Sequence, residues 1–240
     1  MNTNAAILII GNEILSGRTK DANAVWLAEK LAARGLKLCE IRVVRDEEDD
    51  IISAVHALSD KYDLVFTTGG IGPTHDDITA PCMAKTFNVA LPLNDDARRA
   101  LEEHYTARHQ DVTEARLRMA RIPEGAKLID NPVSGAPGFI IKNVYVMAGV
   151  PKIMQAMYEG IEETLPKGAA LHTRTIPIAA GESQLAAPLE KVQNDFPNVE
   201  IGSYPGKDIV EIVVRGADED EVEKAVARVE ELSLKTQKAI

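Results

Sequence analysis

Residues 64–79 read LVFTTGGIGPTHDDIT and carry the clearest indication of the fold class. Its first five residues are apolar or threonine, as in a strand that is buried on both faces of a parallel sheet. A loop rich in glycine and aspartate follows over residues 69–77. Pro81 then fits only the first turn of a helix, for which we expect Thr79 to be the N-cap. This order of strand, polar loop and helix is typical of an α/β fold.

The same alternation extends outward from this stretch in both directions. We predict strands at 5–10, 36–44, 64–68, 127–129, 139–141 and 144–147, and helices at 21–34, 47–59, within 95–121 and from 151 onward. Strands that alternate with helices in this way pair in parallel and carry helices on both faces. The sequence therefore predicts a three-layer α/β/α domain with a mostly parallel sheet.

The pattern changes after the helix breakers Pro166 and Gly168. Strands are predicted at 172–178, 199–204 and 209–215, and helices at 182–196 and 219–232. We therefore expect two domains, an α/β/α domain over 1–167 and a small α+β domain over 168–240.

Composition excludes several classes of function. The 240 residues include 27 lysines and arginines against 37 aspartates and glutamates, a net charge of −10, so a nucleic-acid or anionic-membrane partner is not expected. Aromatic residues make up only 4%, too few for stacking single-stranded nucleic acid. Cys39 and Cys82 are predicted to be buried thiols of a reducing compartment, and the apolar run 5–10 is too short to span a membrane. We expect a cytoplasmic protein.

Ligands of open α/β sheets bind outside the carboxyl ends of the strands. Three polar segments fall there, namely residues 11–13 (Gly11, Asn12 and Glu13), Asp46, and the loop after the third strand. Their convergence on one edge of the sheet favours a ligand site. Taken singly, Glu13 fits an ordinary loop charge, and the residues alone favour a solvated loop carboxylate for Asp46.

The loop 69–77 is the most informative of these segments. Its glycines let the backbone approach an anion closely, and successive N–H groups can surround a phosphate. A tight turn without a ligand is the alternative, and the residues leave both open. Asp76 and Asp77 beside an anion site indicate a divalent cation that bridges them to the anion. The candidate ligand-binding residues here are Thr68, Gly69, Gly70, Gly72, Pro73, Thr74 and Asp76.

The segment 132–138 (PVSGAPG) is a second candidate loop. Ser134, Gly135 and Gly138 would suit contact with a phosphate, and a bent connection is the alternative.

The loop 69–77 matches neither a Rossmann fingerprint nor a P-loop, because the third glycine and the GxxxxGK[ST] pattern are missing.

Four ordered segments carry a resemblance to a known family. Residues 10–17, 21–27, 67–79 and 131–139 resemble the competence/damage-inducible protein A family, specifically its N-terminal molybdopterin-binding-like (MoaB/Mog-like) domain. Residues 181–183 and 202–205 resemble the middle domain of the same family. The chain ends at Ile240, which leaves no room for the deamidase domain of longer members, so we expect that activity to be absent.

The resemblance implies a function and assigns roles to two carboxylates. Asp46 and Asp77 match the acidic residues that line the family's active site, as catalytic residues and metal ligands. Some members resemble metal-dependent pyrophosphatases acting on ADP-ribose or FAD, and others in the superfamily bind molybdopterin. The implied cofactor is Mg, Mn or Co, with a monovalent cation as a further candidate and molybdopterin as the alternative ligand.

The resemblance also implies a homo-oligomer, for which Trp26 is a candidate interface residue. The sequence departs from the family pattern at Asn12, where many members have Asp, at Met147-Ala148, and at Ile153. The departures at Met147-Ala148 and at Ile153 affect the substrate contacts that the resemblance implies for the loop that contains them.

Overall fold

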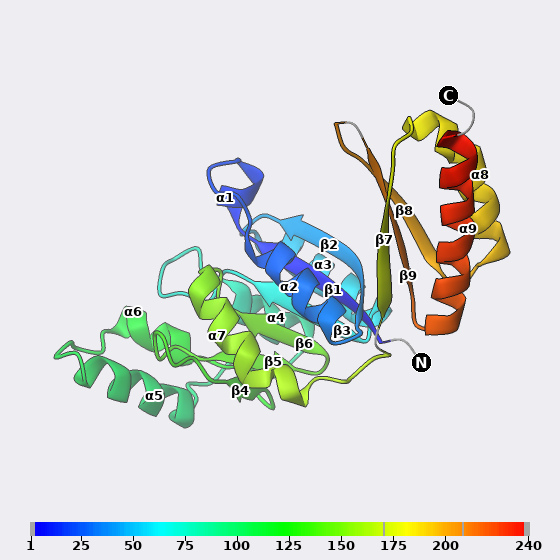
Figure 1. Ribbon diagram of the computed structural model, residues 1–240. Coiled ribbons are helices and arrows are strands. Elements are labelled where there is room, and N and C mark those ends of the chain that lie inside the picture. The colour runs from blue at the N-terminus through cyan, green and yellow to red at the C-terminus, as the bar shows by residue number, and fades with distance from the viewer. Residues whose placement is uncertain (1–2, 170, 208, 238–240) are drawn as a thin grey trace. The chain divides into compact units, whose positions relative to one another are not determined.

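The computed structural model describes residues 3–169, 171–207 and 209–237. The chain divides into two compact units between Gly168 and Ala169. The first unit contains a six-stranded sheet and the second a three-stranded sheet (Figure 1).

The sheet of the first unit has the strand order β2-β1-β3-β6-β5-β4. Its strands are β1 (Asn4–Ile10), β2 (Lys37–Val44), β3 (Leu64–Thr68), β4 (Lys127–Ile129), β5 (Gly138–Ile141) and β6 (Val144–Met147). Strand β1 pairs in parallel with β2 and β3, and β3 pairs in parallel with β6. Only β5 runs against its two neighbours. The predicted mostly parallel sheet is therefore confirmed.

Helices cover both faces of this sheet. They are α1 (Asn12–Leu15), α2 (Asn23–Ala33), α3 (Glu48–Lys61), α4 (Thr79–Thr86), α5 (Asp95–Thr106), α6 (Glu114–Leu117) and α7 (Pro151–Ile161), with 3₁₀ turns η1 (Arg118–Ala120) and η2 (Glu162–Thr164). Successive residues of β1 face opposite sides, so Leu8 packs in a core with α3, α4 and α5, whereas Ile7 packs with α2 and α7. Figure 1 shows α2 and α7 on one face of the sheet, as a three-layer α/β/α fold requires.

Two local predictions are wrong. Thr79 is not the N-cap of α4, because Ile78 occupies that position and the buried Thr79 hydroxyl donates to the carbonyl oxygen of Gly69 at 3.0 Å. Cys39 is exposed, because β2 is an edge strand whose side chains alternate in exposure. Cys82 is buried as predicted, and burial raises the pKa of its thiol to about 11.

The end of the first unit is fastened to the corner between α2 and β2. The Arg34 guanidinium donates to the carbonyl oxygens of Leu165 at 2.7 Å and Pro166 at 3.2 Å. The N–H of Gly168 donates to the carbonyl oxygen of Arg34 at 3.0 Å. A Cβ atom at Gly168 would overlap the carbonyl group of Gly35, so a glycine is required for this close approach.

The second unit has the predicted α+β organisation. Its elements are β7 (His172–Ile178), α8 (Glu182–Asp195), β8 (Glu200–Pro205), β9 (Val210–Gly216) and α9 (Glu219–Gln237). The antiparallel sheet β7-β9-β8 and both helices enclose one apolar core that includes Leu185, Ile212 and Val222. Across the described part of the chain, no helix is long and apolar enough to cross a membrane.

Candidate functional site

A cavity of about 580 Å³ lies where the parallel strands of the first unit end. Its walls include Ile10 at the end of β1, Asp46 beyond β2, the loop beyond β3, and residues 148–151 beyond β6. We call it the main cavity. The predicted site residues that line it are Glu13, Asp46, Gly69, Gly70, Gly72, Pro73, Asp76, Asp77 and Ser134. The three segments expected to converge on this edge therefore do so.

Two glycines determine the backbone conformation at the start of the loop 69–77. Gly69 and Gly70 have φ angles of +106° and +66°, in the region that side-chain-bearing residues rarely adopt. A Cβ atom at Gly69 would overlap the carbonyl oxygen of Ile10, and one at Gly70 would overlap the Thr79 hydroxyl. The loop thus lies directly against the end of β1, with no room for side chains between them.

The loop leaves consecutive amides unpaired. The N–H of Gly69 donates to the carbonyl oxygen of Met147 at 3.2 Å. Among the residues that the structure describes, the N–H groups of Gly70, Ile71 and Gly72 have no hydrogen-bond acceptor. All three residues line the main cavity. Successive free amides of this kind form a binding site for a phosphate group.

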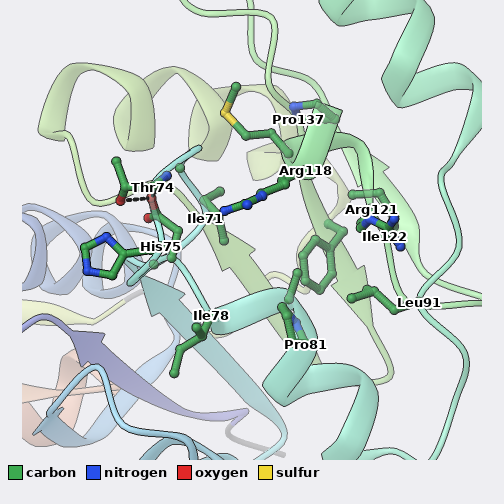
Figure 2. Close-up of a pocket in the computed structure, with 16 residues that line it drawn as sticks. Ile71, Thr74, His75, Ile78, Pro81, Leu91, Arg118, Arg121, Ile122 and Pro137 are labelled. Carbon is green, nitrogen blue, oxygen red and sulfur yellow. Dashed lines mark hydrogen bonds between the residues drawn. The ribbon is translucent and has the colours of Figure 1, made fainter. Parts of the chain in front are cut away.

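The Asp77 carboxylate folds back onto the loop. Its Oδ2 accepts hydrogen bonds from the Thr74 N–H at 2.8 Å and the Thr74 hydroxyl at 2.6 Å. The same hydroxyl also lies within hydrogen-bonding distance of Oδ1 of Asp76. A dashed line in Figure 2 marks a hydrogen bond of Thr74. Bonding to Thr74 and to its own amide lowers the pKa of Asp76 from its ordinary value. Asp76 is therefore suited to remain ionised beside the cavity.

Asp46 has a specific role in the local structure. Its Oδ2 accepts a hydrogen bond from the Asn12 N–H at 2.7 Å, and so it holds the first residue of α1. The preceding Gly11 N–H donates to the carbonyl oxygen of Val44 at 3.1 Å. Asp46 is half-buried and lines the main cavity, so the interpretation of a freely solvated loop carboxylate does not describe it.

Six predicted residues do not line the main cavity, namely Gly11, Asn12, Thr68, Thr74, Gly135 and Gly138. Thr68 is only 1% exposed. A Cβ atom at Gly135 would overlap His104, and one at Gly138 would overlap the carbonyl oxygen of Val146. These two glycines therefore serve packing. Thr74 lines a smaller neighbouring cavity instead.

Asn131 organises the second loop of the site, a role that was not predicted from the sequence. Its buried side chain accepts hydrogen bonds from the N–H groups of Val133 and Ser134, both at 3.1 Å. It donates to the Ser134 hydroxyl at 2.6 Å and to the carbonyl oxygen of Ala136 at 2.7 Å. An asparagine at the start of a turn-rich segment is the sequence signal that points to this arrangement.

Two arginines near the site were also missed. Arg118 and Arg121 line the smaller cavity, which lies beside the loop 69–77 (Figure 2). No sequence signal identifies them, because they follow the loop by about forty residues and belong to the helical stretch around η1. By contrast, the main cavity is lined by no lysine or arginine of the described chain.

The carboxylates at the main cavity fit a hard cation only in part. Asp46 and Asp77 each use Oδ2 in the hydrogen bonds above, and within the described ranges neither Oδ1 has a partner. Carboxylate oxygens suit Mg²⁺ or Mn²⁺. The described residues, however, bring together no group of three His, Cys, Asp or Glu side chains able to hold a metal. A cation here would also need oxygen atoms from a ligand or water.

Known proteins are similar to this chain over most of its length. A protein of Archaeoglobus fulgidus is 37% identical over 226 residues, covering 94% of this chain and 96% of the relative. Protein Ta0487 of Thermoplasma acidophilum is 33% identical over 249 residues, covering 97% and 96%. The crystal structure of the protein CinA, of unknown function, from Thermoplasma acidophilum matches with a TM-score of 0.62 and 37% identity, covering 68% of this chain and 98% of that one.

Family models account for both units. Residues 170–238 match the middle domain of FAD synthase. Residues 6–167 match the family described as a probable molybdopterin binding domain, and this match spans the entire main cavity. The chain therefore belongs to the molybdopterin-binding-domain (MoaB/Mog-like) family, in the CinA-like form that joins this domain to an FAD synthase middle domain.

Proposed function

We propose that this protein hydrolyses the diphosphate linkage of a nucleotide such as ADP-ribose or FAD with the aid of a divalent cation. One observation carries the proposal. Three consecutive unpaired amides, at residues 70–72, line the same cavity as two carboxylates that each keep one oxygen free. Backbone amides attract a phosphate, whereas carboxylates repel it. A site that contains both can bind a phosphate when a cation lies between the phosphate and the carboxylates. The FAD synthase middle domain in the same chain supports a nucleotide ligand.

Each part of the site has a role in this proposal. The N–H groups of Gly70, Ile71 and Gly72 bind and orient one phosphate of the substrate. Asp46 and Asp77 would hold the cation, since each has one carboxylate oxygen without a hydrogen bond among the described residues. A bound Mg²⁺, Mn²⁺ or Co²⁺ ion would supply neutralisation of phosphate charge and a water of lowered pKa. Thr74 keeps Asp77 in place through its two hydrogen bonds.

The small number of protein ligands gives the proposal a specific consequence. Mg²⁺ is commonly bound through one or two carboxylates together with substrate phosphates and water. With Asp46 and Asp77 as the two proposed protein ligands, we expect the cation to bind weakly alone and tightly with a diphosphate. Titration of Mn²⁺ into the protein with and without inorganic pyrophosphate, followed by electron paramagnetic resonance, measures this difference.

A screen of substrates against metals tests the function itself. ADP-ribose and FAD are incubated with the full chain and Mg²⁺, Mn²⁺ or Co²⁺, and the released AMP is quantified by chromatography. We expect turnover with at least one metal and none in excess chelator. Turnover no greater than in the chelated control for every pair would refute the proposal.

A second candidate function is the binding of molybdopterin in cofactor assembly. The match of residues 6–167 to a probable molybdopterin binding domain favours it. The same amides would then hold the single phosphate of the pterin. A fluorescent pterin that co-purifies with the protein, together with no hydrolysis in the screen, would support this function over the first.

A further inference from the structure

A second cavity of about 280 Å³ shares one wall with the main cavity. We call it the arginine pocket; besides the residues it shares, its lining includes Ile78, Ala80, Pro81, Leu91, Arg118, Arg121, Ile122 and Phe139. The two cavities have Gly70, Ile71, Gly72, Asp77 and Met119 in common. A ligand whose phosphates bind the loop amides can therefore extend in two directions, into one cavity on each side.

The walls of the arginine pocket are mainly apolar. Ile78 and Pro81 lie along one side and Leu91 and Ile122 along the other, as Figure 2 shows. Phe139 closes the interior and is 1% exposed. Such walls suit a flat apolar ring and offer little to a strongly hydrated phosphate.

The two arginines complete the pocket. Both are exposed, and within the described residues neither guanidinium takes part in a hydrogen bond or ion pair. Figure 2 shows the Arg118 side chain extending across the pocket toward Ile71, with Arg121 near Ile122. A guanidinium plane stacks readily on an aromatic ring, and bases are commonly held in this way. An unpaired arginine over an apolar cavity is thus a ready stacking partner.

The size of the pocket limits what it holds. Cavities for whole drug-sized ligands measure roughly 300–1,000 Å³. At about 280 Å³ the arginine pocket accommodates one ring system, and the main cavity, at about 580 Å³, takes a larger group. The pair of volumes matches a molecule with two unequal arms joined at its phosphates.

We propose that the arginine pocket is the nucleobase subsite, in which Arg118 stacks on the base while the diphosphate lies on residues 70–72. The second arm of the substrate then occupies the main cavity. The proposal rests on the proposed function for the identity of the ligand as a nucleotide. It adds Arg118 as a specificity-determining residue that acts on the base and not on the phosphates.

Calorimetry with two probes tests the subsite. ADP and inorganic pyrophosphate are titrated into the full chain in the presence of Mg²⁺. The variants are Arg118→Ala, Ala80→Phe, which fills the pocket from α4, and the control Arg99→Ala, which removes an arginine of α5 outside both cavities. We expect Arg118→Ala to weaken ADP binding about tenfold, as for the loss of one stacked base. Ala80→Phe should weaken it at least as much, whereas the control should not.

Pyrophosphate provides the decisive contrast. Its affinity should change less than twofold in Arg118→Ala and Ala80→Phe, because it has no base. Equal weakening of ADP and pyrophosphate in Arg118→Ala would place this arginine on the phosphates and overturn the proposal. Unchanged ADP binding in both variants, or no ADP binding by the unmodified protein, would also overturn it.

Measurements of hydrolysis distinguish a failure of the subsite proposal from a failure of the proposed function. If ADP-ribose is hydrolysed with the same KM by Arg118→Ala, Ala80→Phe and the unmodified protein, the subsite is wrong and the function stands. If ADP binding depends on Arg118 but no nucleotide is hydrolysed, the subsite stands and the function is wrong.

Discussion

Two loops of the first unit line the main cavity, and they are built in opposite ways. The loop 69–77 leaves the consecutive amides of residues 70–72 unpaired and keeps two aspartates at the cavity. The loop 131–137 uses its polar groups internally, since Asn131 makes four side-chain hydrogen bonds within it. Both loops contain glycines and both were candidates for phosphate contact. The two loops therefore differ in their unpaired amides and not in having glycines, and this difference is what favours the loop 69–77 for the proposed phosphate contact.

The largest effect is expected from Gly69→Ala in the first loop. The substitution places a side chain at φ +106° against the carbonyl oxygen of Ile10, where neither backbone segment can yield. We expect the free energy of unfolding to fall by about 3 kcal/mol or more. Gly17→Ala is the matched control, because Gly17 has φ +71° but open space around it, and it should cost about 1 kcal/mol. Urea unfolding measures both, and equal losses would show that the contact with Ile10 does not matter.

Asp77→Asn should have the next largest effect, on activity and not on stability. An asparagine oxygen still accepts the hydrogen bonds from Thr74, so the loop keeps its shape, but the charge for the cation is lost. We expect metal-dependent turnover to fall roughly 100-fold or more. Asp76→Asn, its neighbour, should reduce turnover only a few-fold. Similar small losses of turnover in both variants would show that the metal is not held by this loop.

Asn131→Ala tests the second loop. The change leaves the N–H groups of Val133 and Ser134 without their acceptor, and we expect a loss of about 2 kcal/mol in the free energy of unfolding. Ser134→Ala should cost less than half of this, because those two backbone bonds remain. Pyrophosphate affinity should be similar in both variants and the unmodified protein. A large loss of pyrophosphate binding in Ser134→Ala would make the second loop a phosphate site after all.

Lowering the pH should change the loop 69–77 but not the loop 131–137. We expect this change to be the smallest of the predicted effects. The pKa of Asp76 is lowered in the folded protein, so its bond to Thr74 is present above the ordinary carboxyl pKa and is lost as the pH falls through the lowered value. Nuclear magnetic resonance of the Asp76 carboxyl carbon follows this titration. Thr74→Val should raise the pKa of Asp76 toward its ordinary value. Amide signals of 133–135 should stay in place over the same range, and a joint shift of both loops would contradict the comparison.

Much of the fold was predictable because it depends on local patterns. The predicted spans of β3, β4, β6 and β7 coincide with those observed, since short apolar runs between turn residues define strands. The errors involve distant partners. Thr79 satisfies the capping rule locally, but the carbonyl oxygen of Gly69 takes its hydroxyl instead. Cys39 looks like a core residue until its strand is found at the edge of the sheet.

The part of the site that follows the parallel strands was predictable, because the carboxyl ends of such strands lie at the same edge of the sheet. Glu13, Asp46 and Asp77 come together because each follows a parallel strand, and the sequence shows this order. Arg118 comes from a 3₁₀ turn whose position no periodic pattern determines. The roles of Gly135 and Gly138 depend on contacts with His104 and Val146 that only the folded chain brings close.

The fastening of Gly168 to the corner at Arg34 has a consequence for anyone who divides or recombines this chain. A fragment that stops at Lys167 loses the hydrogen bond from the Gly168 N–H and exposes the carbonyl oxygen that accepted it. The natural place to cut is therefore after Gly168, where the last of these bonds is made. In a chimera, a foreign second unit should follow this glycine directly, because any other residue at position 168 would meet the backbone of Gly35.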